Sequence, residues 1–177
     1  MRFEFLQCVN TLQTLYKDRA KISINFRVAT AEDLELIEST VETDLREDLK
    51  SYLVSMGSVF DEAEREWPAF SVDGGSHVYS IVAAGVNEIL AEWNYGLNSS
   101  NKLRRTHALG PDKWLLIGRI DTHLTFYVSN STGEVLSCSD DYDQSLFRYP
   151  SLLNFFEQSN QLLEKFDHDE VDDFIGM

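Results

Sequence analysis

The sequence predicts an α+β protein of one domain, in which helices pack on a mainly antiparallel sheet. Its 177 residues suit one hydrophobic core of ordinary size. Hydrophobic residues make up 43% and aromatic residues 12% of the chain, so it can bury a packed core instead of remaining disordered. Helix-like and strand-like segments follow one another irregularly, which is typical of α+β proteins and not of regular parallel-sheet proteins.

The first part of the chain is predicted to contain helical regions on either side of a short strand. Apolar residues recur at helical spacing over 3–16, and apolar and polar residues alternate over 22–28, as in a half-buried strand at a sheet edge. Thr30 begins the clearest helix, because its hydroxyl can cap the first free amides and acids follow in the first turn. Gly57 ends this helical spacing, and the residues leave open whether it is one helix or two joined near Thr43.

The second part is predicted to be richer in strands. Short strands and turns are expected over 58–85, and a polar loop over 98–113. A hairpin is expected to turn at 130–133, where Asn, Ser, Thr and Gly follow one another, and Pro150 is placed where a helix would begin. The remaining predicted elements are a buried strand at 78–82, a helix at 86–97, strands at 114–118, 123–128 and 134–138, and a last helix up to Phe166.

These elements divide the chain into three parts. Residues 1–28 are interpreted as an N-terminal extension of helix and strand, residues 29–166 as the main domain, and residues 167–177 as an acidic tail. No run approaches the roughly 20 apolar residues of a membrane span, and Glu4 and Gln7 interrupt the apolar start, which is unlike a signal peptide. Two lone cysteines are typical of reduced thiols, so we expect a cytoplasmic protein.

The charge excludes two classes of partner. The chain has 30 acidic against 15 basic side chains, a formal net charge of −15. A nucleic-acid binder, or a protein that docks on an anionic membrane, needs a surplus of bases. The acids are concentrated in two blocks: residues 30–66 have twelve acids and three bases, and residues 167–177 have five acids and no base. This distribution favours a basic protein partner, although acidic helix faces are often only solvated surface.

No group of residues predicts catalysis, a metal or a cofactor. The four histidines and two cysteines lack the spacing of a zinc site. On a strand, Asp121 and His123 would share a face, as the acid and the imidazole of a catalytic triad require, but no nucleophile motif accompanies them, and a turn between two strands accounts better for Asp121. An EF-hand loop begun at Asp141 would need Gly at position 146 and Glu at 152, and both positions are Leu. We therefore expect a protein that is not an enzyme and has no bound cofactor.

Three blocks of the chain resemble the SUKH superfamily, which includes Smi/Knr-type regulators and bacterial immunity proteins. They are the helical region 30–58, the hairpin 113–141 and the helix after Pro150, and the resemblance covers roughly residues 28–166. Two positions depart from the family pattern: Arg46 stands where the family has Pro, and Met56 replaces Asn before the glycine. The matching residues are Ile37, Glu38, Leu45, Leu49, Lys50, Leu53, Gly57, Ile117, Gly118, Gly133, Ser151 and Phe155.

The resemblance implies an α+β protein-binding domain that is not an enzyme. Bacterial members of the family neutralise a toxin, often a nuclease, and a chain of charge −15 is suited to the groove of a basic nuclease. We therefore expect an immunity protein that binds a basic toxin directly; the alternative is a regulatory or scaffold domain without an antitoxin role. The residues expected to contact the partner are Glu38, Glu42, Asp140, Asp141, Asp143, Asp169, Glu170, Asp172 and Asp173.

Overall fold

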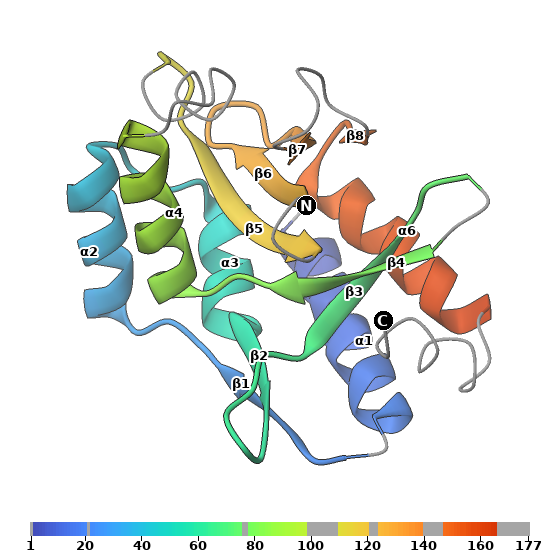
Figure 1. Ribbon diagram of the computed structural model, residues 1–177. Coiled ribbons are helices and arrows are strands. Elements are labelled where there is room, and N and C mark those ends of the chain that lie inside the picture. The colour runs from blue at the N-terminus through green and yellow to red at the C-terminus, as the bar shows by residue number, and fades with distance from the viewer. Residues whose placement is uncertain are drawn as a thin grey trace.

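Six antiparallel strands form the main sheet of the computed structural model, and helices pack against it (Figure 1). Each strand of this sheet pairs with its neighbour in the sequence, in the order β3-β4-β5-β6-β7-β8. A separate two-stranded sheet contains β1 and β2. The predicted α+β class is confirmed. The structure describes residues 2–20, 22–75, 78–98, 110–120, 124–139 and 147–165.

The helices and strands of the described residues largely follow the predicted segments. The helices are α1 (Arg2–Arg19), α2 (Ala31–Val41), α3 (Glu47–Ser55), α4 (Val86–Asn98) and α6 (Leu152–Lys165). The strands are β1 (Ile24–Arg27), β2 (Ser58–Asp61), β3 (Pro68–Asp73), β4 (Val78–Ala83), β5 (Trp114–Ile120), β6 (Leu124–Ser129), β7 (Val135–Ser139) and β8 (Arg148–Tyr149).

The helical region after Thr30 is two helices. Thr30 caps α2 through a capping box with Asp33, as its hydroxyl accepts a hydrogen bond from the Asp33 amide at 3.2 Å. Helix α2 ends at Val41, because Glu42 takes the left-handed conformation at φ 56°. The following residues form a linker, 42–46, and α3 then begins at Glu47. The structure therefore places the break close to Thr43, where the sequence left the question open.

The strand predicted at 22–28 is β1, and it belongs to the small sheet. It runs antiparallel to β2, with Phe26 opposite Val59 and Arg27 opposite Ser58. The even-numbered side chains are partly buried and Asn25 and Arg27 are exposed, which is the alternation of a half-buried strand. After the strand, the Ala29 amide donates to the Leu53 carbonyl at 2.8 Å and brings the chain back to the core.

A cluster of aromatic rings joins the helices to the sheet. Phe155 and Phe156, both on α6, pack against Phe70 of β3 with ring centroids 5.4 Å apart. Phe156 also contacts Tyr52 of α3 at 5.4 Å and Phe5 of α1 at 5.8 Å. Helix α1 is therefore packed into the same core as the sheet, since its buried residues also belong to this core.

Helices cover different parts of the sheet, as Figure 1 shows. Helices α1 and α6 lie side by side, and α6 packs on β3. Helix α4 packs on β5, and α2 lies beside α4 at the outer edge of the fold. The outward side of α2 remains available to solvent, and Glu32 and Glu35 are exposed on it.

Candidate protein-binding site

Five exposed carboxylates follow one another along α2 and into α3. Residues three apart share one face of a helix, so Glu32 and Glu35 lie on the same outward side of α2, and the exposed C-cap residue Glu42 follows at the end of the helix. Asp44 of the linker and Glu47, the first residue of α3, are also exposed. We call these five residues the acidic strip. Over α2 alone it extends for about 15 Å, since an α-helix rises about 1.5 Å per residue.

The bases within residues 30–66 leave the acidic strip without a close ion pair. Arg46 pairs with Asp48 at 2.9 Å, Lys50 with Glu38 at 2.7 Å, and the remaining base, Arg65, with Asp61 at 2.7 Å. Each base therefore neutralises an acid outside the strip. The contact with Glu38 is the main reason that the pKa of Lys50 is raised, and the charges of Glu47 and Asp44 raise it further at longer range. The strip is thus a concentrated, solvent-exposed negative field.

The carboxylate of Glu38 makes its contacts within the protein itself. Its Oε1 atom accepts a hydrogen bond from the Leu45 amide at 2.8 Å and lies 2.7 Å from the Lys50 ammonium group. The contact with Lys50, and after it the hydrogen bond from the Leu45 amide, holds the pKa of Glu38 below its usual range. Glu38 therefore positions the linker between the two helices, and its charge is already paired.

The β6–β7 turn holds the linker in place from the other side. The Asn130 side chain accepts from the Arg46 amide at 3.0 Å and donates to the Asp44 carbonyl at 2.8 Å. The Arg46 guanidinium also donates to the Ser131 carbonyl at 2.8 Å. Gly133 completes the turn with φ 79°, against the Arg46 side chain. These contacts come from a distant part of the sequence. They hold in place the backbone of the linker, which carries part of the acidic strip.

Two of the residues predicted to contact a partner lie in the described part of the chain. Glu42 is exposed and belongs to the acidic strip, whereas Glu38 is paired with Lys50. The other seven, Asp140, Asp141, Asp143, Asp169, Glu170, Asp172 and Asp173, lie outside the described residues, as do Asp121, His123 and the tail 167–177. Four members of the strip were not among the predicted contacts, although the spacing of Glu32 and Glu35 already places these two on one helix face.

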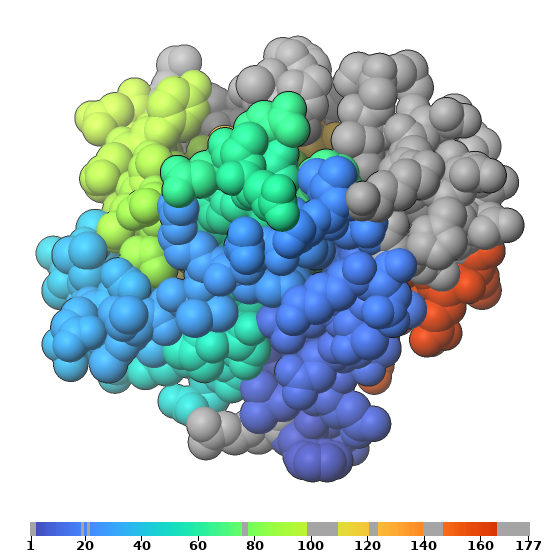
Figure 2. All heavy atoms as spheres, turned by 90° about the horizontal axis from the view of Figure 1, so that it is seen from below, coloured from blue at the N-terminus to red at the C-terminus, as the bar shows by residue number. Residues whose placement is uncertain are grey.

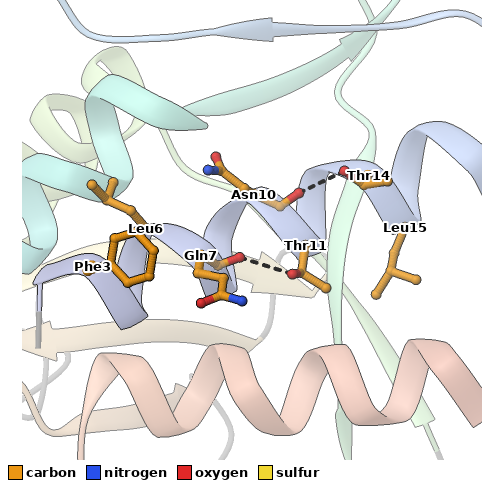
Figure 3. A pocket seen from close by; sticks show the side chains of 7 residues that line it. All are labelled: Phe3, Leu6, Gln7, Asn10, Thr11, Thr14 and Leu15. Carbon is orange, nitrogen blue, oxygen red and sulfur yellow. Dashed lines mark hydrogen bonds between the residues drawn. The ribbon is translucent and has the colours of Figure 1, made fainter.

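A shallow hollow of about 670 Å³ runs along the outer face of α1 (Figure 3). The described side chains that line it include the apolar Phe3, Leu6 and Leu15 and the amides of Gln7 and Asn10. The hydroxyls of the two threonines in its lining donate to backbone carbonyls of α1, each at 3.0 Å. The described lining contains no charged group, so this hollow is chemically distinct from the acidic strip.

The described residues contain no group of three or more metal-ligating side chains that could hold an ion. Both cysteines are buried and free. Burial, and secondarily the charge of Glu157, raises the pKa of the Cys8 thiol to about 11, so the thiol stays protonated and weakly nucleophilic near neutral pH. Asn160 donates to the Cys8 carbonyl at 3.0 Å, which places this cysteine in the packing of α1 against α6.

Among the described residues, no helix is both long enough and apolar enough to span a membrane. A scan against protein-family models found no match to the chain, and a search of curated proteins returned none. The SUKH resemblance therefore stays a prediction that depends on the residues quoted above.

Proposed function

We propose that this protein binds a basic protein through the acidic strip, and that it acts as an immunity protein of the SUKH type. The observation that carries the proposal is the pairing pattern in residues 30–66. All three bases there face acids outside the strip, and five exposed carboxylates remain on α2, the linker and the first residue of α3. A basic toxin domain, such as a nuclease, is the partner that this field would attract.

Geometry supports binding at this site in a second way. The strip is attached to the core through the capping box of α2, the Glu38 contacts and the β6–β7 turn. A preorganised surface loses little conformational entropy when a partner docks. Carboxylates held in place can therefore occupy the positions of phosphates in a nuclease groove without a costly rearrangement. No catalytic step is part of this proposal, since occlusion of the toxin's groove is enough for neutralisation.

The experiment compares two variants that lose the same amount of charge. The strip variant is E32Q/E35Q/E42Q/E47Q, and the control is E62Q/E64Q/E157Q/E164Q, which removes four exposed carboxylates from the β2–β3 connection and α6. The partner to be tested is a basic toxin-type protein, if the gene beside that of this chain encodes one. Association is followed by stopped-flow fluorescence over a range of salt concentrations, and inhibition of the toxin by an activity assay.

We expect the strip variant to associate about tenfold more slowly or worse, with a weaker salt dependence, because steering by charge raises association rates by about 10 to 1,000-fold. The control variant should change the rate by no more than about twofold, since screening limits the reach of distant charges. Equal effects in both variants would assign the binding to net charge and not to the strip. A toxin that is neither bound nor inhibited would exclude the immunity role.

A further inference from the structure

The outer edge of β1 plays no part in the proposed function. In the small sheet, the Asp61 amide donates to the Arg65 carbonyl and the Trp67 amide to the Val59 carbonyl, at 2.9 and 2.8 Å. The backbone groups of Val59 and Asp61 therefore point away from β1. Because successive residues of a strand direct these groups to opposite sides, Ser58 and Phe60 must bond to β1.

The register of the small sheet then fixes the orientation of β1. Ser58 is opposite Arg27 and Phe60 is opposite Asn25, so Arg27 and Asn25 direct their backbone groups towards β2. Ile24 and Phe26 consequently direct their N–H and C=O groups outwards. Among the described residues, no backbone or side-chain hydrogen bond to these outward groups occurs. The Phe26 ring contacts the Lys17 ammonium group, 5.2 Å from the ring centroid, and this contact leaves the backbone groups of Phe26 open. The outer edge of β1 is an open hydrogen-bonding edge.

Apolar side chains continue the edge beyond both ends of the strand. Ile22 is 41% exposed and Val28 is 44% exposed, and by the two-residue period both belong to the face of Ile24 and Phe26. Figure 2 shows this part of the chain on the surface, between α1 and α2. An open edge flanked by exposed apolar residues is the feature that natural proteins usually protect, and here Arg27 is the single charged side chain of β1.

We propose that the outer edge of β1 pairs with the same edge of a second copy of this chain, antiparallel and centred on Asn25. In this register Ile24 bonds to the partner's Phe26, and Phe26 to the partner's Ile24. One step further out, Ile22 lies opposite the partner's Val28. A two-fold interface must be self-complementary, and this register meets that condition, because every outward group meets its counterpart. The result is a continuous four-stranded sheet, β2-β1-β1-β2.

Carboxylates are scarce around this edge. Residues 1–29 have five bases and two acids, whereas the chain as a whole has a net charge of −15. A two-fold contact through this segment avoids placing the acidic strip of one copy against that of the other. In the proposed register Arg27 lies opposite the partner's Ser23, so no like charges face each other. The remaining repulsion between the copies is long-ranged, so salt should strengthen the dimer by screening it.

The test uses two double variants at the same pair of exposed positions. In I22K/V28K, the register places two introduced lysines opposite each other at each end of the interface. In I22K/V28E, it places a lysine opposite a glutamate. Sedimentation velocity over about 1 μM to about 1 mM measures the dissociation constant of each variant and of the unmodified chain. Circular dichroism and thermal unfolding of dilute samples verify that all three chains are folded.

We expect the unmodified chain to dimerise within this range and more tightly at higher salt. The I22K/V28K variant should weaken the dimer about tenfold or more, because like charges face each other, while I22K/V28E should retain it. In hydrogen exchange by NMR, the Ile24 and Phe26 amides should become protected as the concentration rises, and the Asn25 and Arg27 amides should be protected throughout. A chain that stays monomeric, or a dimer that both variants leave equally intact, overturns the proposal.

The proposed function can fail without affecting this inference, and the reverse also holds. Binding of a basic partner to the acidic strip should weaken as salt is added, whereas the β1 dimer should strengthen. The strip variant leaves β1 unchanged, so its self-association should be at least as strong as that of the unmodified chain.

Discussion

The hydroxyl of Tyr52 joins three segments of the core at one point. It lies 3.1 Å from the Ala84 carbonyl and 3.3 Å from the carbonyls of Gly57 and Ile117, and the side chain is fully buried. One hydroxyl proton serves all three acceptors, which come from the end of α3, the β4–α4 connection and β5. Burial raises the pKa of this phenol above its usual range, so it remains a neutral donor.

We predict that Tyr52→Phe lowers the free energy of unfolding by about 1–3 kcal/mol, because a buried carbonyl loses its donor without gaining water. Urea denaturation followed by circular dichroism measures the change. Tyr95→Phe is the matched control, since Tyr95 is 54% exposed and its hydroxyl can exchange a protein partner for water. We expect the control to change stability by less than about 0.5 kcal/mol. Equal losses in both variants would contradict a special role for Tyr52.

Glu38 leads to a prediction about pH. Its contacts with Lys50 and the Leu45 amide lower its pKa in the folded state. Its charge therefore contributes stability that is complete above the unfolded pKa, about 4.3, and that is lost as the pH falls through the lower folded value. Glu38→Gln should reduce the free energy of unfolding by about 0.5–1 kcal/mol at pH 7.

The measurement is urea denaturation of the unmodified chain and the variant at several pH values. The difference between them should be constant near neutral pH and should shrink in acid. Glu35→Gln is the control, because Glu35 is exposed and makes no ion pair with a described residue, so its substitution should change the unfolding free energy at pH 7 by less than about 0.5 kcal/mol. A difference that grows in acid would contradict the assigned direction of the shift.

At the scale of elements, the linker between α2 and α3 depends on residues far away in the sequence. Gly133 of the β6–β7 turn has φ 79°, and a Cβ atom there would lie 2.7 Å from Arg46 Nη2. Gly75, after β3, has a similar φ of 88°, but no atom lies within 4 Å of its added Cβ. Both glycines have a left-handed backbone conformation, but only at Gly133 would an added methyl group meet a neighbouring side chain.

This difference predicts the outcome of two alanine substitutions. Gly75→Ala should lower the unfolding free energy by about 1–2 kcal/mol, the usual cost of a left-handed alanine. Gly133→Ala should cost at least about 1 kcal/mol more, because the new methyl group displaces the Arg46 guanidinium from the Ser131 carbonyl. Thermal and urea unfolding measure both. If the two substitutions cost the same, the Arg46 side chain moves aside freely and the turn does not hold the linker.

The same linker shows what could and could not be predicted from the sequence. The start of α2 was predictable, because Thr30 and Asp33 are close in the sequence and cap the helix locally. The end of α2 was left open, because no Pro or Gly marks it. The contact that holds the next residues joins Arg46 to Asn130, which is 84 residues away. Such pairings depend on the folded arrangement and have no signature in a local pattern.

The candidate site, like the linker, could be predicted from the sequence only in part. The excess of acid in residues 30–66 is visible in the composition, and helical spacing predicts that several of these acids share a face. Which acids remain unpaired was not predictable. Glu38 lies in α2 and Glu42 is the residue that caps its end, four positions later, yet Glu38 meets Lys50 of α3 and Glu42 faces solvent. The open edge of β1 likewise required the register with β2.

At the scale of the whole molecule, two electrostatic effects oppose each other in this chain of net charge −15. Close ion pairs attract, and more distant carboxylates repel one another. The close pairs in residues 30–66 have separations of 2.7–2.9 Å, whereas the carboxylates of the acidic strip make no such pair with any base in the described part of the chain. Raising the ionic strength from about 10 mM to about 150 mM shortens the Debye length from about 30 Å to about 8 Å. This change removes much of the repulsion between distant carboxylates and leaves the contact pairs comparatively intact.

We therefore predict that sodium chloride over this range raises the thermal midpoint of the dilute protein by about 2–4 °C, the shift that about 1 kcal/mol produces in a chain of this size. Differential scanning calorimetry measures it. The variant E62Q/E64Q/E157Q/E164Q should show a smaller rise, because it has four fewer negative charges to screen. A midpoint that falls with salt would mean that the attraction within the ion pairs outweighs the repulsion between carboxylates. The acidic strip would then not destabilise the isolated molecule.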